Sequence, residues 1–339
     1  MNRWLIASVT LALWAVASSC AHSGAPARSG APYRCDPRQE RCYVVDLAGA
    51  GTDALADAAR LRAVATDGAL AVIAKRLRSM GLDDVRLRKF GDFGVLVQFP
   101  AGPPSPKLDE LLVRPAALAF RLEDSSDAGR GLFGAARETI ESFNASHVGT
   151  APITIDVDRR DSSSYARADI PPGSLGADVP ASLAAFVAGI KVPAGRIVGY
   201  EVVKAGDSGE DGRAGYVRTR VLLAEPVLTG AHVTTVTPVR SEALRNPELE
   251  IFLDAEGAAK MEDATGRNVG SVLAIQLDDE VIVAPVVVDR IAGGRVKLSL
   301  GRGQSPIESA QESEVLRALL VSGSLPAILR RVDTLGHRD

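Results

Sequence analysis

Aromatic residues and histidines are scarce in this sequence. Phe, Trp and Tyr make up 4% of its 339 residues, so we expect a core built from Ala, Val, Leu and Ile. The histidines are His22, His147, His232 and His337, and none stands at metal-ligand spacing from another ligand type. The sequence therefore predicts no zinc or iron site.

Catalytic and nucleotide-binding motifs are also missing or incomplete. No Ser lies in a nucleophile elbow, and the GRGQS segment at 301–305 lacks the Lys of a phosphate loop. The GAGTDA segment at 49–54 has the outline of a dinucleotide fingerprint, but a tight hairpin pattern replaces the parallel strand that should follow. Asp278 and Asp279 are adjacent in a predicted turn, which is typical of solvated carboxylates. We therefore predict no catalytic residue, no cofactor and no enzymatic activity.

Strong charge of either sign is absent. The formal net charge is −3, which gives no reason to expect nucleic acid or an anionic membrane surface as a partner. Hydrophobic residues make up 46% and charged residues 24%, as in ordinary soluble globular proteins. The length is sufficient for two modest domains.

The N-terminus has the pattern of a targeting segment. Residues 1–19 contain Arg3, then an apolar run at 4–16 that is too short to span a bilayer comfortably, which predicts a signal peptide. The small residues before Cys20 resemble a bacterial lipobox, although Ala17 stands where Leu is usual. That resemblance implies cleavage before Cys20 and lipidation of its thiol, with palmitate in a membrane anchor. The alternative is a plain secretory signal that is cleaved nearby.

Only two further cysteines are present, Cys35 and Cys42. An even pair in an exported protein suggests a disulfide, and we expect these two to form one. The alternative is half of a metal site, for which no His or further Cys lies nearby. Residues 21–34 are rich in Ala, Gly, Ser and Pro, so we interpret 20–42 as a tether that contains the disulfide.

The next part of the chain predicts a ferredoxin-like α+β base at 43–123. Apolar periodicity indicates strand, helix, hairpin, helix and strand, in that order. The predicted elements are the strand 43–47, the helix 67–80, the hairpin 84–99, the helix 108–113 and the strand 117–122. This order of strands and helices is the ferredoxin-like pattern.

A poorly readable insertion at 124–215 separates this base from a second α+β region. The insertion has only weak patterns, for helices at 132–143 and 182–189 and a strand at 197–204. After it, residues 216–326 alternate strands with two helices, and residues 327–339 form a strand and tail. The first of these helices follows Asp254, a good N-cap, and the last ends at Gly323.

Several segments resemble the first periplasmic domain of SecD, the accessory subunit of the bacterial preprotein translocase. They have the same order and spacing as in that family, and segment 69–100 and the tail 325–332 also match. The main segments are PVLTGA at 226–231, FLDAEGAAK at 252–260, LAIQLDDEVIVAPV at 273–286 and SGSLP at 322–326. The resemblance implies a ferredoxin-like base with an inserted α+β head, and a return strand in 327–339 that leads back to the base. The matched residues are mostly turns, caps and core strands, which specify a fold and need not touch a ligand.

The resemblance also implies a role with polypeptide in transit. In the SecD family the head is thought to engage preprotein, the base supports its movement, and a transmembrane part couples that movement to the proton gradient. This sequence shows no transmembrane bundle, and it ends at Asp339, about where the second membrane helix of the family would begin. We therefore expect a stand-alone lipoprotein without proton-driven transport of its own.

Two hypotheses follow for its function. The first is an accessory of protein export that binds unfolded preprotein, with unfolded polypeptide or Sec membrane components as partners. The alternative is a structural or interaction lipoprotein that docks a folded envelope partner, and reuse of the domain for another envelope task stays open. We expect a lipid-anchored protein on the periplasmic side of the envelope. Ala21 after Cys20 lacks an inner-membrane retention signal, which favours the outer membrane.

Overall fold

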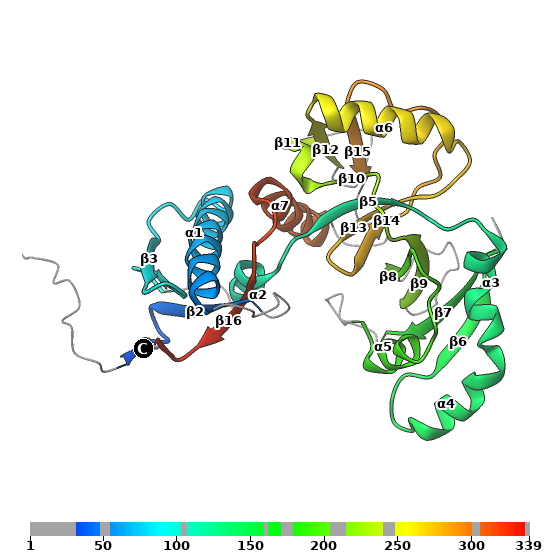
Figure 1. Ribbon diagram of the computed structural model, residues 1–339, viewed down its shortest axis with the longest axis horizontal. Coiled ribbons are helices and arrows are strands. Elements are labelled where there is room, and N and C mark those ends of the chain that lie inside the picture. The colour runs from blue at the N-terminus through cyan, green and yellow to red at the C-terminus, as the bar shows by residue number, and fades with distance from the viewer. Residues whose placement is uncertain are drawn as a thin grey trace, which may run out of the picture.

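The computed structural model describes residues 32–47, 55–102, 107–158, 162–170, 179–203, 215–239, 248–299 and 306–335. These residues form three parts, which we name the base, the middle lobe and the head (Figure 1). The base lies at the left of the figure, the head at the upper right and the middle lobe at the lower right. Helix α7 (Pro306–Ser322) lies between the base and the head.

The base is a four-stranded antiparallel sheet in the order β16-β2-β4-β3. Its elements are β2 (Glu40–Asp46), α1 (Leu55–Ser79), β3 (Arg86–Phe90), β4 (Gly94–Gln98), α2 (Lys107–Val113) and β16 (Ile328–Val332). Helix α7 packs beside α1, so the order β2, α1, β3, β4, α7, β16 forms the ferredoxin-like unit.

The strand predicted at 117–122 is present as β5 (Leu118–Leu122), but its assignment to the base is wrong. This strand pairs with β13 and β10 in another sheet, and β16 takes the fourth position in the base. The alternation of Leu118 and Phe120 indicates a strand without indicating its partner. The closing strand β16 lies within 327–339, where the resemblance to SecD implies a strand that returns to the base.

A short two-stranded ribbon lies over the base sheet on the side away from α1. It joins β1 (Tyr33–Arg34) to β17 (Thr334–Leu335), and Cys35 forms a disulfide with Cys42 of β2 across Cα atoms 6.3 Å apart. Cys35, Cys42, Leu96 and Leu335 make a small buried apolar cluster under the ribbon. The two ends of the described chain therefore meet on the base, and the assignment of 33–42 to a tether is wrong because these residues are folded onto the base sheet.

The middle lobe has its own core. Its elements are α3 (Asp127–Ala135), η1 (Arg137–Thr139), α4 (Ile140–Ser146), β6 (Ile153–Val157), β7 (Ser164–Asp169), α5 (Ala181–Ala188), β8 (Arg196–Val203) and β9 (Tyr216–Leu223). Side chains such as Phe133, Leu183 and Val217 are fully buried between the helices and the sheet. The region predicted as one helix at 132–143 is divided among α3, η1 and α4. The sequence pattern did not predict β6 or β7.

The head combines a three-stranded sheet with part of an eight-stranded one. Its remaining elements are β10 (Leu228–Thr229), η2 (Gly230–His232), β11 (Val233–Val239), β12 (Glu248–Leu253), α6 (Ala255–Arg267), β13 (Leu273–Leu277), β14 (Glu280–Val283) and β15 (Arg295–Ser299). The larger sheet has the order β10-β5-β13-β14-β8-β9-β7-β6, so it runs from the head into the middle lobe. Asp254 caps α6 by accepting a hydrogen bond from Gly257 N at 2.7 Å.

One apolar core extends through the base and the head. It contains Ile73 of α1, Leu319 of α7 and Ile251 of β12, all nearly inaccessible to solvent. Helix α7 packs against both α1 and β11, so it connects the two cores directly. Every helix among the described residues is too short or too polar to cross a lipid bilayer.

Candidate functional site

Most residues singled out in the sequence lie apart from one another. Cys20, the segments 49–54 and 301–305, and His22 and His337 fall outside the described residues. His147 stacks on Phe143, and His232 contacts the capping carboxylate of Asp254. Within the described ranges, no three His, Cys, Asp or Glu side chains are placed to hold a metal.

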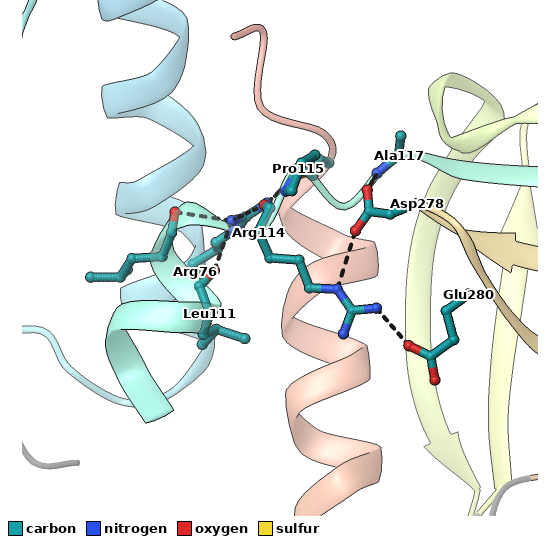
Figure 2. Close-up of polar contacts among 9 residues, drawn as sticks. Arg76, Leu111, Arg114, Pro115, Ala117, Asp278 and Glu280 are labelled. Atoms are coloured by element: carbon teal, nitrogen blue, oxygen red, sulfur yellow. Dashed lines mark hydrogen bonds and ion pairs between the residues drawn. The ribbon is translucent and has the colours of Figure 1, made fainter. Parts of the chain in front are cut away.

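The densest polar site lies where the chain crosses between base and head. Arg76, inside α1, is fully buried and donates to the carbonyl oxygens of Leu111 and Arg114 at 2.8 and 2.6 Å (Figure 2). It also contacts Ser322 Oγ and Gly323 O, at the end of α7, at 3.2 and 3.4 Å. One guanidinium therefore binds the C-terminal ends of two helices, where free carbonyls and the helix dipole favour a cation.

Arg76 has no carboxylate partner among the described residues. Burial lowers the pKa of its guanidinium to about 10, which is still well above neutral pH. The group therefore stays charged, and backbone carbonyls replace the water that it has lost. An interaction of this kind fixes the positions of α1, α2 and α7 relative to one another.

A second arginine continues the junction into the head. Arg114 Nε and Nη2 bind Asp278 at 3.1 Å and Glu280 at 2.8 Å, in the turn between β13 and β14 (Figure 2). Asp278 also accepts from Ala117 N at 2.9 Å. Of the two adjacent aspartates of the sequence, Asp278 thus binds the connecting chain through its carboxylate, whereas Asp279 accepts a hydrogen bond from Tyr200 N of β8 through its backbone carbonyl.

The outgoing and returning connections run side by side at this junction. Leu325 N donates to Pro115 O at 2.8 Å, so residues that follow α7 bind residues that follow α2. Ala116 has a positive φ of 59°, an uncommon conformation for Ala that the surrounding hydrogen bonds hold in place. The junction is therefore an ordered crossing in which hydrogen bonds tie the two connections to each other.

The head presents three exposed valines on two hydrogen-bonded segments. We name Val269, Val286 and Val288 the valine patch; they are 56%, 39% and 85% exposed. Gly270 N donates to Val287 O and Val287 N to Ser271 O, both at 2.8 Å, which brings the two segments together. Exposed apolar side chains are typical of a surface that binds a partner where several lie together, whereas single ones are ordinary.

A buried ion network lies on the sheet of the middle lobe. Glu201 accepts from Arg218 Nε at 2.7 Å and from Arg220 Nε at 2.6 Å. Arg220 also binds Glu123, which follows β5 in the head, and Arg218 binds Asp158. The cavity beside the network is about 10 Å³, enough for one water molecule, so the network is structural.

Sequence reasoning missed the junction and the ion network. Arg76 lies three residues after Ile73 and one before Leu77, both of them buried on the apolar side of α1. An arginine on an apolar stripe is a signal for a buried polar contact, and it was available from the sequence. The partners are backbone carbonyls of distant segments, which no residue pattern specifies.

Comparison with known proteins identifies relatives for most of the chain. Residues 204–327 match the family model for the P1 head subdomain of SecDF. The SecD subunit of the protein translocase of Desulfurispirillum indicum is 27% identical over 272 residues, which cover 80% of this chain and 40% of that protein. The SecDF subunit of Thermus thermophilus is 38% identical over 108 residues, or 32% of this chain and 14% of that protein. This chain thus spans about two fifths of the SecD relatives that it matches over most of its length.

A solved structure supports the fold. The chain aligns with a structure described as that of a membrane component SecDF that enhances protein export, with a TM-score of 0.50 and 19% identity. The alignment covers 86% of this chain and 97% of that one. The predicted resemblance to SecD and the predicted α+β fold class are both confirmed.

Proposed function

We propose, from its homology to SecD, that this chain is an accessory of protein export that binds unfolded preprotein on the periplasmic side of the cell envelope. The observation that carries the proposal is the match of residues 204–327 to the SecDF P1 head subdomain. The named relatives are protein translocase subunits, which makes a polypeptide in transit the first ligand to test.

The valine patch is the surface that we assign to this binding. An unfolded chain exposes apolar side chains that a folded protein has buried, and Val286 and Val288 offer apolar contacts without needing a particular sequence. The ordered junction at Arg76 and Arg114 supports the head on the base while the chain is held. This role needs no bound cofactor and no covalent step.

The test is binding of residues 21–339, which include every described residue, to a fluorescent unfolded secretory protein and to its folded form. We expect saturable binding of the unfolded protein alone. Changing Val286 and Val288 to Asp should weaken it about tenfold or more, since two apolar contacts are replaced by charges. The matched control is Val148→Asp in the middle lobe, because Val148 is 88% exposed and Val288 85%.

Failure of the wild-type protein to bind the unfolded chain would overturn the proposal. An equal loss in the Val148→Asp control would exclude the valine patch as the binding surface. Binding of a folded envelope protein instead would favour docking of a folded partner. The specific observation behind that second function is Arg167 of the middle lobe, which is partly exposed and stacks on Tyr216. Tyr and Arg often dominate the binding energy of protein interfaces.

We further propose that the chain is a lipoprotein with its anchor at Cys20, in the outer membrane. The support is the small-residue pattern before that cysteine. Labelling of cells with radioactive palmitate should mark the wild-type protein and leave Cys20→Ser unlabelled. Equal labelling of both proteins, or none of either, would rule out the anchor, and fractionation of the labelled membranes would identify the one that holds it.

A further inference from the structure

The side of the base sheet that faces away from α1 and α7 carries exposed arginines; we name it the outer face. On β3, Lys89 binds Asp67 of α1 at 2.8 Å, so Lys89 is on the inner side. Successive side chains of a strand alternate between faces, which places Arg88 and Arg86 on the outer face. Both are exposed.

The ribbon over this face contributes a third arginine. Tyr33 packs on Phe90 with ring centroids 5.6 Å apart, and Cys35 and Leu335 lie in the apolar cluster beneath. Arg34, between Tyr33 and Cys35, therefore points away from the sheet into solvent. Arg88 is near enough for its charge to act on the Tyr33 hydroxyl, whose pKa burial raises to about 12.

We name Arg34, Arg86 and Arg88 the basic face. None of the three has an ion-pair partner among the described residues. Two of the acidic groups nearby are engaged: Glu40 accepts hydrogen bonds from Tyr33 and Gln98, and Asp46 binds Arg330. Asp36 and Asp333 beside the ribbon, and Asp83 and Asp84 just before β3, are the exposed carboxylates that remain close by.

The position of the chain ends shows what would meet this face. The pairing of β1 with β17 places both ends of the described chain on the outer face, at the far end of the base from the head (Figure 1). Cys20 is only twelve residues before Pro32, and an extended chain of that length reaches about 40 Å at most. A lipid at Cys20 would therefore hold the basic face near a membrane surface.

We propose that the basic face binds the anionic headgroups of a phospholipid bilayer. Exposed arginines attract anionic lipids from within about a Debye length of the surface, and guanidinium groups bind phosphate through two parallel hydrogen bonds. Tyr33 and Phe90 lie among these arginines, and aromatic side chains are favoured at the membrane interface. Bound in this way, the base lies on the lipid and the head projects away from it.

The test is flotation of unlipidated residues 21–339 with vesicles of phosphatidylglycerol and phosphatidylcholine in equal parts. We expect binding to these vesicles, none to pure phosphatidylcholine, and release at about 1 M salt, where charges are screened beyond about 3 Å. The double variant Arg86→Glu, Arg88→Glu should bind at least about tenfold more weakly. The single variant Arg34→Glu, which changes β1 instead of β3, should also weaken binding to these vesicles.

The matched control is the double variant Arg267→Glu, Arg290→Glu in the head. These arginines are also exposed, and the control changes the net charge of the protein by the same amount. It should keep the wild-type affinity. Absence of wild-type binding to anionic vesicles, or equal weakening in the control, overturns the proposal. So does tight binding of polyglutamate with no binding of vesicles, which would identify an acidic polypeptide as the ligand. Because no unfolded protein is present, this result is independent of the preprotein assay.

Discussion

At the scale of single residues, Arg76 is the side chain on which the junction depends most. Replacing it by Met fills much of the same space but leaves the carbonyls of Leu111 and Arg114 without a donor. Each buried unsatisfied group costs about 1–3 kcal/mol, so we expect Arg76→Met to lower the free energy of unfolding by about 3 kcal/mol. Urea denaturation measures this loss. Arg78→Met, an exposed change two residues along α1, should alter stability by less than about 0.5 kcal/mol, and an equal loss in both would contradict the assignment.

Glu201 makes a prediction about pH. Burial alone would raise the pKa of its carboxyl, but the guanidinium groups of Arg220 and Arg218 hold that pKa below its ordinary value of 4.5. The stability that Glu201 contributes is therefore fully present above about pH 4.5 and is lost as the pH falls through the lowered pKa. Glu201→Gln leaves two buried arginines without their carboxylate and should cost about 3–5 kcal/mol at pH 7.

Free energies of unfolding at pH 7 and at pH values below about 4 provide the measurement. The difference in the free energy of unfolding between Glu201→Gln and the wild-type protein should become smaller as the pH falls. The control is Glu314→Gln on α7, an exposed carboxylate paired with Arg317 three residues away, which should change little at any pH. A difference in the free energy of unfolding that does not change with pH would mean that Glu201 stabilises the middle lobe by packing alone.

At the scale of elements, the disulfide and the ribbon form one unit. The bond closes only a short loop between Cys35 and Cys42, for which chain entropy gives a stabilisation of about 2–3 kcal/mol. We expect the double variant Cys35→Ser, Cys42→Ser to lose about that amount. It should also show faster amide exchange in β17, which has no cysteine of its own, because β17 pairs with β1. An unchanged rate of amide exchange in β17 would show that β1 and β17 stay paired without the disulfide.

The sequence predicted those elements whose pattern is local. The β3–β4 hairpin and α5 follow from alternation and apolar periodicity within a few residues. Alternation in Leu118–Leu122 predicted a strand without its partner. The resemblance to SecD, rather than the local pattern of Ile328–Val332, indicated the strand that returns to the base and pairs with β2. The sequence pattern did not predict the valine patch. Residues 281–288 are almost all apolar, which is typical of one buried strand, but β14 ends at Val283 and Val288 is exposed.

At the scale of the whole molecule, the base and the head share one core, whereas the middle lobe has another. Leu319 lies on α7, which packs against α1 of the base and β11 of the head. A cavity at Leu319 should lower the stability of the base and of the head together, because packed interiors relax only partly around a lost side chain. Leu319→Ala is expected to cost about 2–5 kcal/mol and to speed amide exchange in α1 and β11 alike. Its control is Leu183→Ala, since Leu183 is equally buried in the core of the middle lobe.

Leu183→Ala should speed exchange in β6 and β7 and leave α1 and β11 close to wild type. If Leu319→Ala instead loosened only the head, the base would fold independently, and α7 would be a support that the head can leave. Faster amide exchange in both α1 and β11 would mean that the base and the head are coupled. Any movement of the head against the base must then break the core around α7 or move α7 with the head. The exchange pattern therefore distinguishes a base and head that act as one packed unit from two parts that move separately.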